Sequence, residues 1–257
     1  MFGFKKHRRK KLFETELRPD WKNIIERNVK FYGFLSKDQK KTLNGLIQVF
    51  MYEKIFEGCG GIEITDEMKL TISAQACLLI LEMDTDIYPF LRTILVYPHA
   101  YKARFQRRLQ DGSIVEGRQA RLGESWSRGQ VVLAWDEILN DISNINDGQN
   151  LVFHEFAHQL DEETGSANGI PVSTNHPLYS DWKRIISKEY ENLLQAVTSG
   201  QETIIREYGA TNKTEFFAVV TECYFEKPNE LKDYSRELNE LYYSFYQIDT
   251  AHAIKSI

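Results

Sequence analysis

The chain is predicted to fold as an α+β domain, because short strand-like segments are interspersed with long helical ones. Apolar residues recur at helical spacing from Trp21 to Lys54, and a long apolar helix is predicted from Met68 to Met83. Arg92–Tyr97 and Gln130–Trp135 are short apolar runs typical of strands, and Ile62–Ile64 alternates like a third. The sequence therefore predicts a helical N-terminal part followed by a small mixed sheet.

Local signals place several boundaries between these elements. Ser36 followed by Gln39 predicts a helix cap, and Thr65 predicts the start of the apolar helix. Phe56–Gly61 is rich in glycine but lacks the Lys-Ser/Thr ending of a phosphate loop, so it is interpreted as a tight bend. Arg104–Ser127 is polar and dotted with glycine, which predicts a hairpin or an extended loop.

The composition is that of an ordinary globular protein and narrows the classes of function. Of the 257 residues, 42% are hydrophobic and 27% are charged. The formal net charge of −5 gives no electrostatic bias toward nucleic acid, so direct nucleic-acid binding is not expected. The 3 cysteines form no C-x-x-C pair, which argues against a disulfide framework and a thiolate zinc site.

The two ends of the chain suggest one domain behind a basic tail. No stretch reaches the ~20 apolar residues that span a bilayer, and no secretory signal is recognised, so a cytoplasmic location is expected. Residues 1–13 include the cationic run Lys5–Lys11 and are predicted to form a solvated basic tail. A weak contact of this tail with an anionic membrane surface or an acidic partner is the alternative. Residues 14–257 are predicted to form a single domain.

The strongest chemical signal is the pattern His-Glu-x-x-His, formed by His154, Glu155 and His158. Residues four apart lie on one face of a helix, so both imidazoles can reach one metal ion while Glu155 is turned toward its rim. Burying two imidazoles in an apolar helix without partners costs free energy, and a zinc ion satisfies both. The pattern therefore predicts two zinc ligands and a general base for hydrolysis.

A catalytic zinc site also needs a third protein ligand and room for water. One class of these enzymes has Gly three and His or Asp six residues after the second histidine, but Asp161 and Thr164 stand there. The other class takes a glutamate from a later helix, where Glu215 and Glu222 share one face. Glu215 also fits a capping box with Asn212, and Glu222 also fits an exposed position. Spacing alone leaves the choice open.

Several segments spread along the chain add to the His-Glu-x-x-His signal. They are Met1–Lys11, Phe56–Gly61, Ile64–Met68, Ala74–Leu79, Ile94–Tyr101, Leu122–Trp126, His154–Asp161 and Thr214–Val219. Together these segments resemble the Mlc titration factor A family of zinc metallopeptidases, which are related to the catalytic domain of anthrax lethal factor. The resemblance covers nearly the whole chain. The chain departs slightly from the family's usual sequence at some positions, such as Thr221–Tyr224. These departures do not affect the expected metal ligands.

The resemblance implies a zincin-like metallopeptidase domain with one Zn²⁺ ion. Glu215 would be the third ligand, and Tyr208 stands seven residues earlier, where the lethal factor domain has a tyrosine that assists catalysis. Glu222 and Asp161 would then support the ligands, Glu222 by orienting a histidine. Val131–Trp135 is further expected to be an edge strand that holds an extended peptide.

Two functions from different classes follow. The first is a zinc-dependent peptidase, of endopeptidase or aminopeptidase type, acting on a peptide or protein substrate. The second is a regulatory binding protein that sequesters a sugar-responsive transcriptional repressor, with peptidase activity secondary. A purely structural zinc site is disfavoured, because such sites use four ligands, usually including cysteine.

Overall fold

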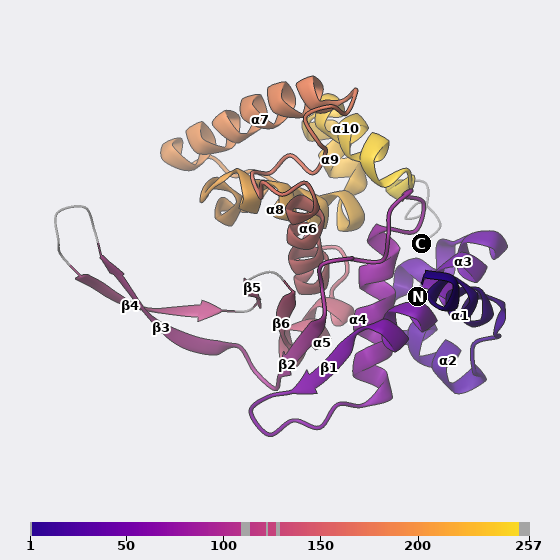
Figure 1. The fold of residues 1–257 in the computed structure, drawn as a ribbon. Helices are drawn as coiled ribbons and strands as arrows, with labels where there is room; N and C mark the ends of the chain where they lie inside the picture. The colour runs from indigo at the N-terminus through magenta and orange to yellow at the C-terminus, as the bar shows by residue number, and fades with distance from the viewer. Residues whose placement is uncertain (1, 109–113, 122, 127–128, 252–257) are drawn as a thin grey trace.

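The computed structural model describes residues 2–108, 114–121, 123–126 and 129–251 (Figure 1). Helices enclose a small sheet, which confirms the predicted α+β class. In the N-terminal half the helical elements are α1 (Phe2–Glu14), α2 (Pro19–Asn28), the 3₁₀ helix η1 (Lys30–Phe34), α3 (Lys37–Glu53) and α4 (Asp66–Leu79). In the C-terminal half they are α5 (Trp135–Ser143), α6 (Leu151–Glu163), α7 (Tyr179–Ser199), η2 (Glu207–Ala210), α8 (Lys213–Glu226), α9 (Pro228–Tyr234) and α10 (Arg236–Tyr246).

The predicted helix starts are confirmed. The side chain of Ser36 accepts a hydrogen bond from the backbone N–H of Gln39, whose side chain accepts one from the backbone of Ser36, so both halves of a capping box are present. Thr65 caps α4 by accepting from the N–H of Met68. The predicted strand at Ile62–Ile64 is wrong, because this segment only connects β1 to α4 and pairs with no described strand.

The main sheet has four strands in the order β1-β2-β6-β5. β1 (Ile55–Gly58), β2 (Thr93–Tyr97) and β6 (Gln130–Ala134) are parallel, and β5 (Gly123–Trp126) runs antiparallel to β6. The mixed sheet is as predicted, but β1 occupies the first half of the segment interpreted as a bend. The turn follows at Gly60 and Gly61, which both have positive φ.

The expectation that Val131–Trp135 is an edge strand is wrong. β6 lies between β2 and β5, so its backbone groups are used on both sides, and Trp135 already begins α5. The edge on this side is β5. The predicted hairpin is present as β3 (Tyr101–Arg108) paired with β4 (Ile114–Arg121), and it projects from the body of the molecule (Figure 1).

Helix α6 runs through the centre of the molecule, between the sheet and α4 on one side and the C-terminal helices on the other (Figure 1). All its residues from Val152 to Asp161 are buried. Phe156 packs against Phe50 of α3 and Tyr88, with ring centroids 5.8 and 4.9 Å away. Because its core contacts come from several directions, α6 is a rigid platform for the side chains that it carries.

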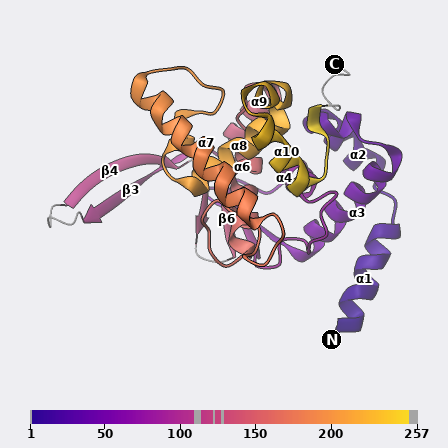
Figure 2. The same cartoon turned by 90° about the horizontal axis from the view of Figure 1, so that it is seen from above.

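The N-terminal segment differs from the predicted solvated tail, because it forms helix α1 and packs on α3 (Figure 2). Arg9 makes a two-pronged ion pair with Glu53, at 2.7 Å for each contact, and a further one with Asp86 at 2.6 Å. The division of the chain into a tail and a domain stays a prediction. Within the described part of the chain, no helix has both the length and the apolar character needed to cross a bilayer.

Candidate metal centre

Helix α6 begins at Asn150, whose side chain accepts a hydrogen bond from the N–H of Phe153 at 2.9 Å. One turn further, His154 and His158 lie on the same face with their ring centroids 4.7 Å apart. Both residues are buried, with 8% of each exposed. The predicted pairing of the two imidazoles on one helical face is therefore confirmed by the geometry.

Helix α8 supplies the glutamates that the sequence singled out. Asn212 caps this helix by accepting from the N–H of Glu215 at 3.0 Å. The Glu215 carboxylate is turned toward α6, with Oε2 lying 3.0 Å from Nε2 of His154 and 3.3 Å from Nε2 of His158. The cap and the contact with the histidines thus coexist at Glu215, and the capping alternative does not remove it from the site.

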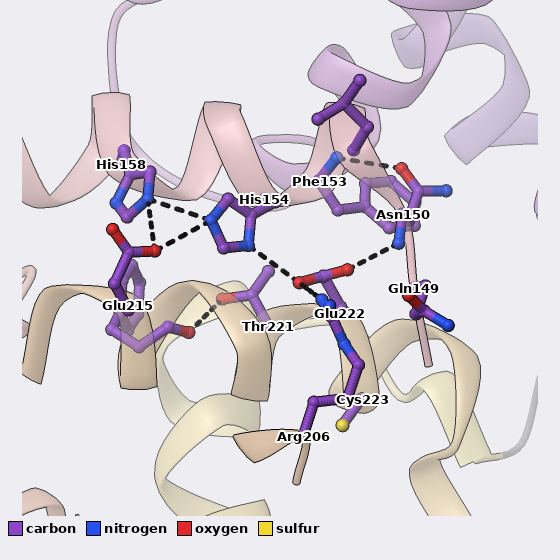
Figure 3. Close-up of polar contacts among 12 residues, drawn as sticks. Gln149, Asn150, Phe153, His154, His158, Arg206, Glu215, Thr221, Glu222 and Cys223 are labelled. Atoms are coloured by element: carbon purple, nitrogen blue, oxygen red, sulfur yellow. Dashed lines mark hydrogen bonds and ion pairs between the residues drawn. The ribbon is translucent and has the colours of Figure 1, made fainter. Parts of the chain in front are cut away.

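The two histidines and Glu215 bring three lone-pair-bearing atoms to one point (Figure 3). The two Nε2 atoms are 3.1 Å apart, and the other two separations among these atoms are 3.0 and 3.3 Å. Two ligands at ~2.0–2.1 Å from a tetrahedral zinc ion lie about 3.3 Å from each other. The donor set therefore fits a small cation by both its chemistry and its spacing.

Glu222 lies two turns beyond Glu215 and contacts the opposite side of the His154 ring. Its Oε1 accepts from Nδ1 of His154 at 2.8 Å, and its Oε2 accepts from the backbone N–H of Asn150 at 2.6 Å. Arg206 donates from Nη2 to the same Oε1 at 2.5 Å. In a neutral His154 ring, this carboxylate favours the proton on Nδ1, so Nε2 would be the nitrogen available to a metal ion on the side of Glu215 and His158.

The pKa values of His154 and Glu215 show that negative charge is concentrated in this site. Burial lowers the pKa of His154, but the carboxylates of Glu215 and Glu222 outweigh it and raise that pKa to about 10. Burial raises the pKa of Glu215, yet its contacts with His154 and His158 bring it far below its usual range. The pocket therefore favours positive charge between these side chains, whether it comes from protons or from a metal ion.

Glu155 lies beside this cluster without joining it. Only 4% of the residue is exposed, and its Oε2 has no hydrogen-bond partner among the residues that the structure describes. Burial raises the pKa of the Glu155 carboxyl, while the positive charges of His154 and His158 oppose that rise. A buried carboxylate oxygen without a protein partner is suited to accept a hydrogen bond from a water or a substrate.

Tyr208 lies on the short helix η2, with its ring centroid 5.8 Å from that of His154. Burial, followed by the negative charges of Glu215 and Glu155, raises the pKa of Tyr208 to about 12, so its hydroxyl keeps its proton. With 44% of the residue exposed, the Tyr208 side chain is partly open to solvent beside His154. The structure therefore brings together the histidines, Glu215 and the predicted tyrosine.

Asp161 lies one turn after His158, is fully buried, and accepts from the N–H of Gly169 at 2.8 Å. Gly169 has a φ of +77°, and a Cβ there would lie 2.2 Å from the carbonyl oxygen of Lys213. Thr214 also donates to the carbonyl of Ala167 at 3.2 Å. Asp161 thus ties the loop after α6 to the start of α8, next to Glu215. Among the hydrogen bonds of the described residues, none joins Asp161 to either histidine.

Sequence reasoning missed the groups that hold the start of α6. Arg206 gives no local signal, because its contact with Glu222 depends on two separate helical elements. Asp141 accepts from the N–H of Leu151 at 2.8 Å, and Glu226 accepts from the N–H groups of Gly148 and Gln149. The first N–H groups of a helix have no partner within the helix and favour nearby acidic side chains. This general preference is the signal that could have pointed to Asp141 and Glu226.

In this α+β fold, two histidines and Glu215 converge beside the buried carboxylate of Glu155. This is the arrangement of a metallopeptidase. The chain belongs to the glucose-regulated metallo-peptidase M90 family, whose model matches residues 4–247. This match confirms the resemblance recognised in the sequence. The relationship to the lethal factor domain stays a prediction.

Named relatives agree with this family. The chain is 44% identical over 244 residues to the uncharacterized protein slr2042 of Synechocystis sp., covering 94% of this chain and 88% of the relative. It is 28% identical over 224 residues to Mlc titration factor A of Klebsiella pneumoniae, covering 86% and 83%. With Mlc titration factor A of Serratia proteamaculans the identity is 29% over 241 residues, covering 92% and 89%.

Proposed function

We propose that this chain is a zinc-dependent peptidase, in which His154, His158 and Glu215 hold one Zn²⁺ ion and Glu155 is the general base. The observation that carries the proposal is the convergence of three lone-pair donors within 4.8 Å of one another. Nitrogen from histidine and oxygen from glutamate are ligands that zinc prefers, and three protein ligands leave a position for water. Membership of a metallopeptidase family supports the same function.

The bound ion would supply Lewis acidity, which makes a water molecule more acidic and polarises the carbonyl of the peptide bond. Glu155 takes a proton from the attacking water and then delivers it to the nitrogen of the leaving amine. Its burial supports this role, because the raised pKa makes the Glu155 carboxylate a stronger base for the proton of the attacking water.

Tyr208 is proposed to donate a hydrogen bond to the oxygen on which negative charge develops. Its raised pKa of about 12 supports this role, since the hydroxyl remains a donor throughout the neutral range. Donors of this kind commonly contribute ~3 kcal/mol to transition-state stabilisation. Half-exposure of the ring leaves its hydroxyl accessible to a substrate that enters beside His154.

Glu222 and Asp161 are proposed to hold the metal ligands in position without binding the metal ion themselves. Glu222 fixes the orientation of the His154 ring through its bond to Nδ1. Asp161 acts at a distance, by holding Gly169 against Lys213 and so steadying the turn from which Glu215 begins. Because α6 and α8 each carry part of the ligand set, their relative placement decides the geometry of the site.

Strand β5 is the candidate for holding the substrate in place of β6. It borders α6, pairs with β6 on one side, and has no second strand neighbour among the described residues. An extended peptide could add to this edge by backbone hydrogen bonds, which suits a peptidase that accepts varied side chains.

The test is a comparison of metal content and hydrolysis in Glu155→Gln and in Glu230→Gln, a control at an exposed glutamate of α9. The wild type should carry one zinc ion and cleave members of a peptide library. Glu155→Gln should keep the zinc and lose at least about 10³-fold in kcat, while the control behaves as wild type. Retained hydrolysis in Glu155→Gln would disprove the assigned base, and lost zinc would make it a ligand.

A second candidate function is supported by the name of the relatives, Mlc titration factor A, which denotes titration of a protein named Mlc. In this proposal the chain binds a transcriptional repressor, and hydrolysis is secondary. The same variant separates the two proposals: purified Mlc from an organism with such a relative should bind Glu155→Gln as tightly as wild type. A regulatory effect that disappears with hydrolysis would favour the peptidase.

A further inference from the structure

Helix α1 carries a concentration of positive charge that the metal site does not use. Its thirteen residues include six lysines and arginines and only one glutamate, while the whole chain has a formal net charge of −5. In both ribbon views α1 lies at the periphery, away from α6 and α8 (Figures 1 and 2). The helix is therefore a local positive surface on an otherwise acidic protein.

This helix is fixed in place by contacts with α3. Gln48 donates from its side chain to the carbonyl oxygens of Leu12 and Thr15, at 3.1 and 2.9 Å. A Cβ at Gly45 would lie 2.2 Å from the ring of Phe13, so only glycine lets that ring approach so closely. Together with the Arg9 ion pairs, these contacts hold α1 with a defined outer face.

The cations divide into two sets. Arg9 and Lys5 lie within ion-pairing distance of Glu53, and Lys10 pairs with Glu14 at 3.8 Å. Lys6, Arg8 and Lys11 are exposed, and none of the described acidic groups pairs with them. These three side chains supply positive charge that the described acidic side chains do not neutralise.

Exposed apolar side chains lie next to these cations. Phe4 is 84% exposed and Tyr52 of α3 is 54% exposed. The Arg8 guanidinium lies 5.1 Å from the centre of the Tyr52 ring and donates to its hydroxyl. Phe4, Leu12 and Tyr52 line a groove of about 480 Å³ between the two helices, together with Lys5, Arg8 and Arg9.

More apolar surface surrounds the end of α3. Ile55, which begins β1, is 62% exposed, and Phe90 is 57% exposed. Lys54 donates from Nζ to the carbonyl oxygens of Tyr88 and Leu91, which holds the Phe90 segment against this junction. Aromatic and aliphatic side chains exposed beside unpaired cations are the combination that binds the headgroup region of a bilayer.

We propose that α1 and the end of α3 form a docking surface for membranes rich in anionic phospholipids. Lys6, Arg8 and Lys11 would contact the lipid phosphates, and Phe4 and Tyr52 would enter the interface. Nucleic acid shares the phosphates but offers no apolar layer to exposed Phe4, so the bilayer explains both halves of the surface.

The test is co-sedimentation of the full chain with vesicles of phosphatidylcholine, with and without about one third phosphatidylglycerol. The wild type should bind only the anionic vesicles. K6E/R8E/K11E should weaken this binding at least about 10-fold, and Phe4→Ser should weaken it several-fold. K37E/K183E/K232E makes the same charge change at exposed lysines outside this surface, on α7, on α9 and at the opposite end of α3 from Tyr52, and should have a much smaller effect.

Circular dichroism and thermal unfolding establish that each variant is folded. Failure of the wild type to bind anionic vesicles, or an equal loss in the control triple variant, would overturn the proposal. Tighter binding to a DNA duplex than to the vesicles, lost in K6E/R8E/K11E but kept in Phe4→Ser, would assign the surface to nucleic acid instead. None of these outcomes depends on peptide hydrolysis.

Discussion

The carboxylate of Glu222 accepts a hydrogen bond from Nδ1 of His154 at 2.8 Å, and it does so while almost fully buried. This contact joins α8 to the centre of α6, one helix turn after the capped start at Asn150. In a neutral ring the carboxylate favours the proton on Nδ1, so Nε2 would be free to bind a metal ion on the side where Glu215 and His158 lie. The relationship explains why two acidic residues share one face of α8.

Replacing Glu222 by Gln should reduce zinc affinity about 10- to 100-fold, because the amide neither selects the tautomer as firmly nor raises the basicity of His154. The measurement is a competition titration against a chelator of known zinc affinity. Glu230→Gln, at an exposed position on the neighbouring helix α9, is the control and should bind zinc as wild type.

Arg206→Gln should act in the same direction with a smaller effect, since it removes one of the donors to Glu222. An unchanged zinc affinity in Glu222→Gln would show that the bond to His154 is structural only. In Glu215→Ala, by contrast, the stoichiometry of bound zinc should fall well below one, which separates a ligand from a supporting carboxylate.

The sequence predicted much of this site because its central part is local. His154 and His158 are four residues apart on one helix, so helical geometry alone pairs them. Choosing between Glu215 and Glu222 required the resemblance, since both lie on the same face of a later helix. Arg206 could not be predicted, because its contact with Glu222 depends on how η2 packs against α8, and no local pattern encodes that.

The fold, too, was predictable only where local sequence patterns determine it. Hydrophobic periodicity and capping residues predicted most helices and strands, including the capping box at Ser36. The order of strands was not predictable, since the short apolar run of β6 is compatible with a central or an edge position. The segment Ile62–Ile64 alternates, yet pairing partners decide whether such a segment becomes a strand, and here β1 is already the outer neighbour of β2.

Tyr208→Phe should lower kcat for peptide hydrolysis about 100-fold and leave KM nearly unchanged, because the lost hydroxyl acts on charge that develops only in the transition state. Steady-state kinetics on a peptide from the library would measure both constants. Tyr243→Phe, a similarly exposed tyrosine on α10, is the control. An increase in KM with kcat maintained would instead make Tyr208 a residue that binds the ground state.

Phe156→Ala should lower the free energy of unfolding by about 3–5 kcal/mol, because the residue is fully buried where α6 packs into the hydrophobic core. Its loss would leave a cavity between Phe50 and Tyr88, whose rings it contacts. Urea denaturation of the metal-free protein measures the change without the contribution of bound zinc. Tyr243→Ala, at an exposed position, should change stability by less than about 0.5 kcal/mol, and a similar loss in both variants would contradict the assigned core.

The carboxyl of Glu226 should make the protein more stable at acidic than at alkaline pH. Burial and nearby carboxylates raise its pKa to about 9, so between its usual range and pH 9 the folded state holds a proton that the unfolded state has lost. The free energy of unfolding should therefore fall as pH rises through this window, by up to about 1.4 kcal/mol per pH unit. Glu226→Gln should remove that part of the slope in urea denaturation series, whereas Glu230→Gln should retain it. An unchanged slope in Glu226→Gln would mean that the N–H groups of Gly148 and Gln149 keep Glu226 ionised in the folded state.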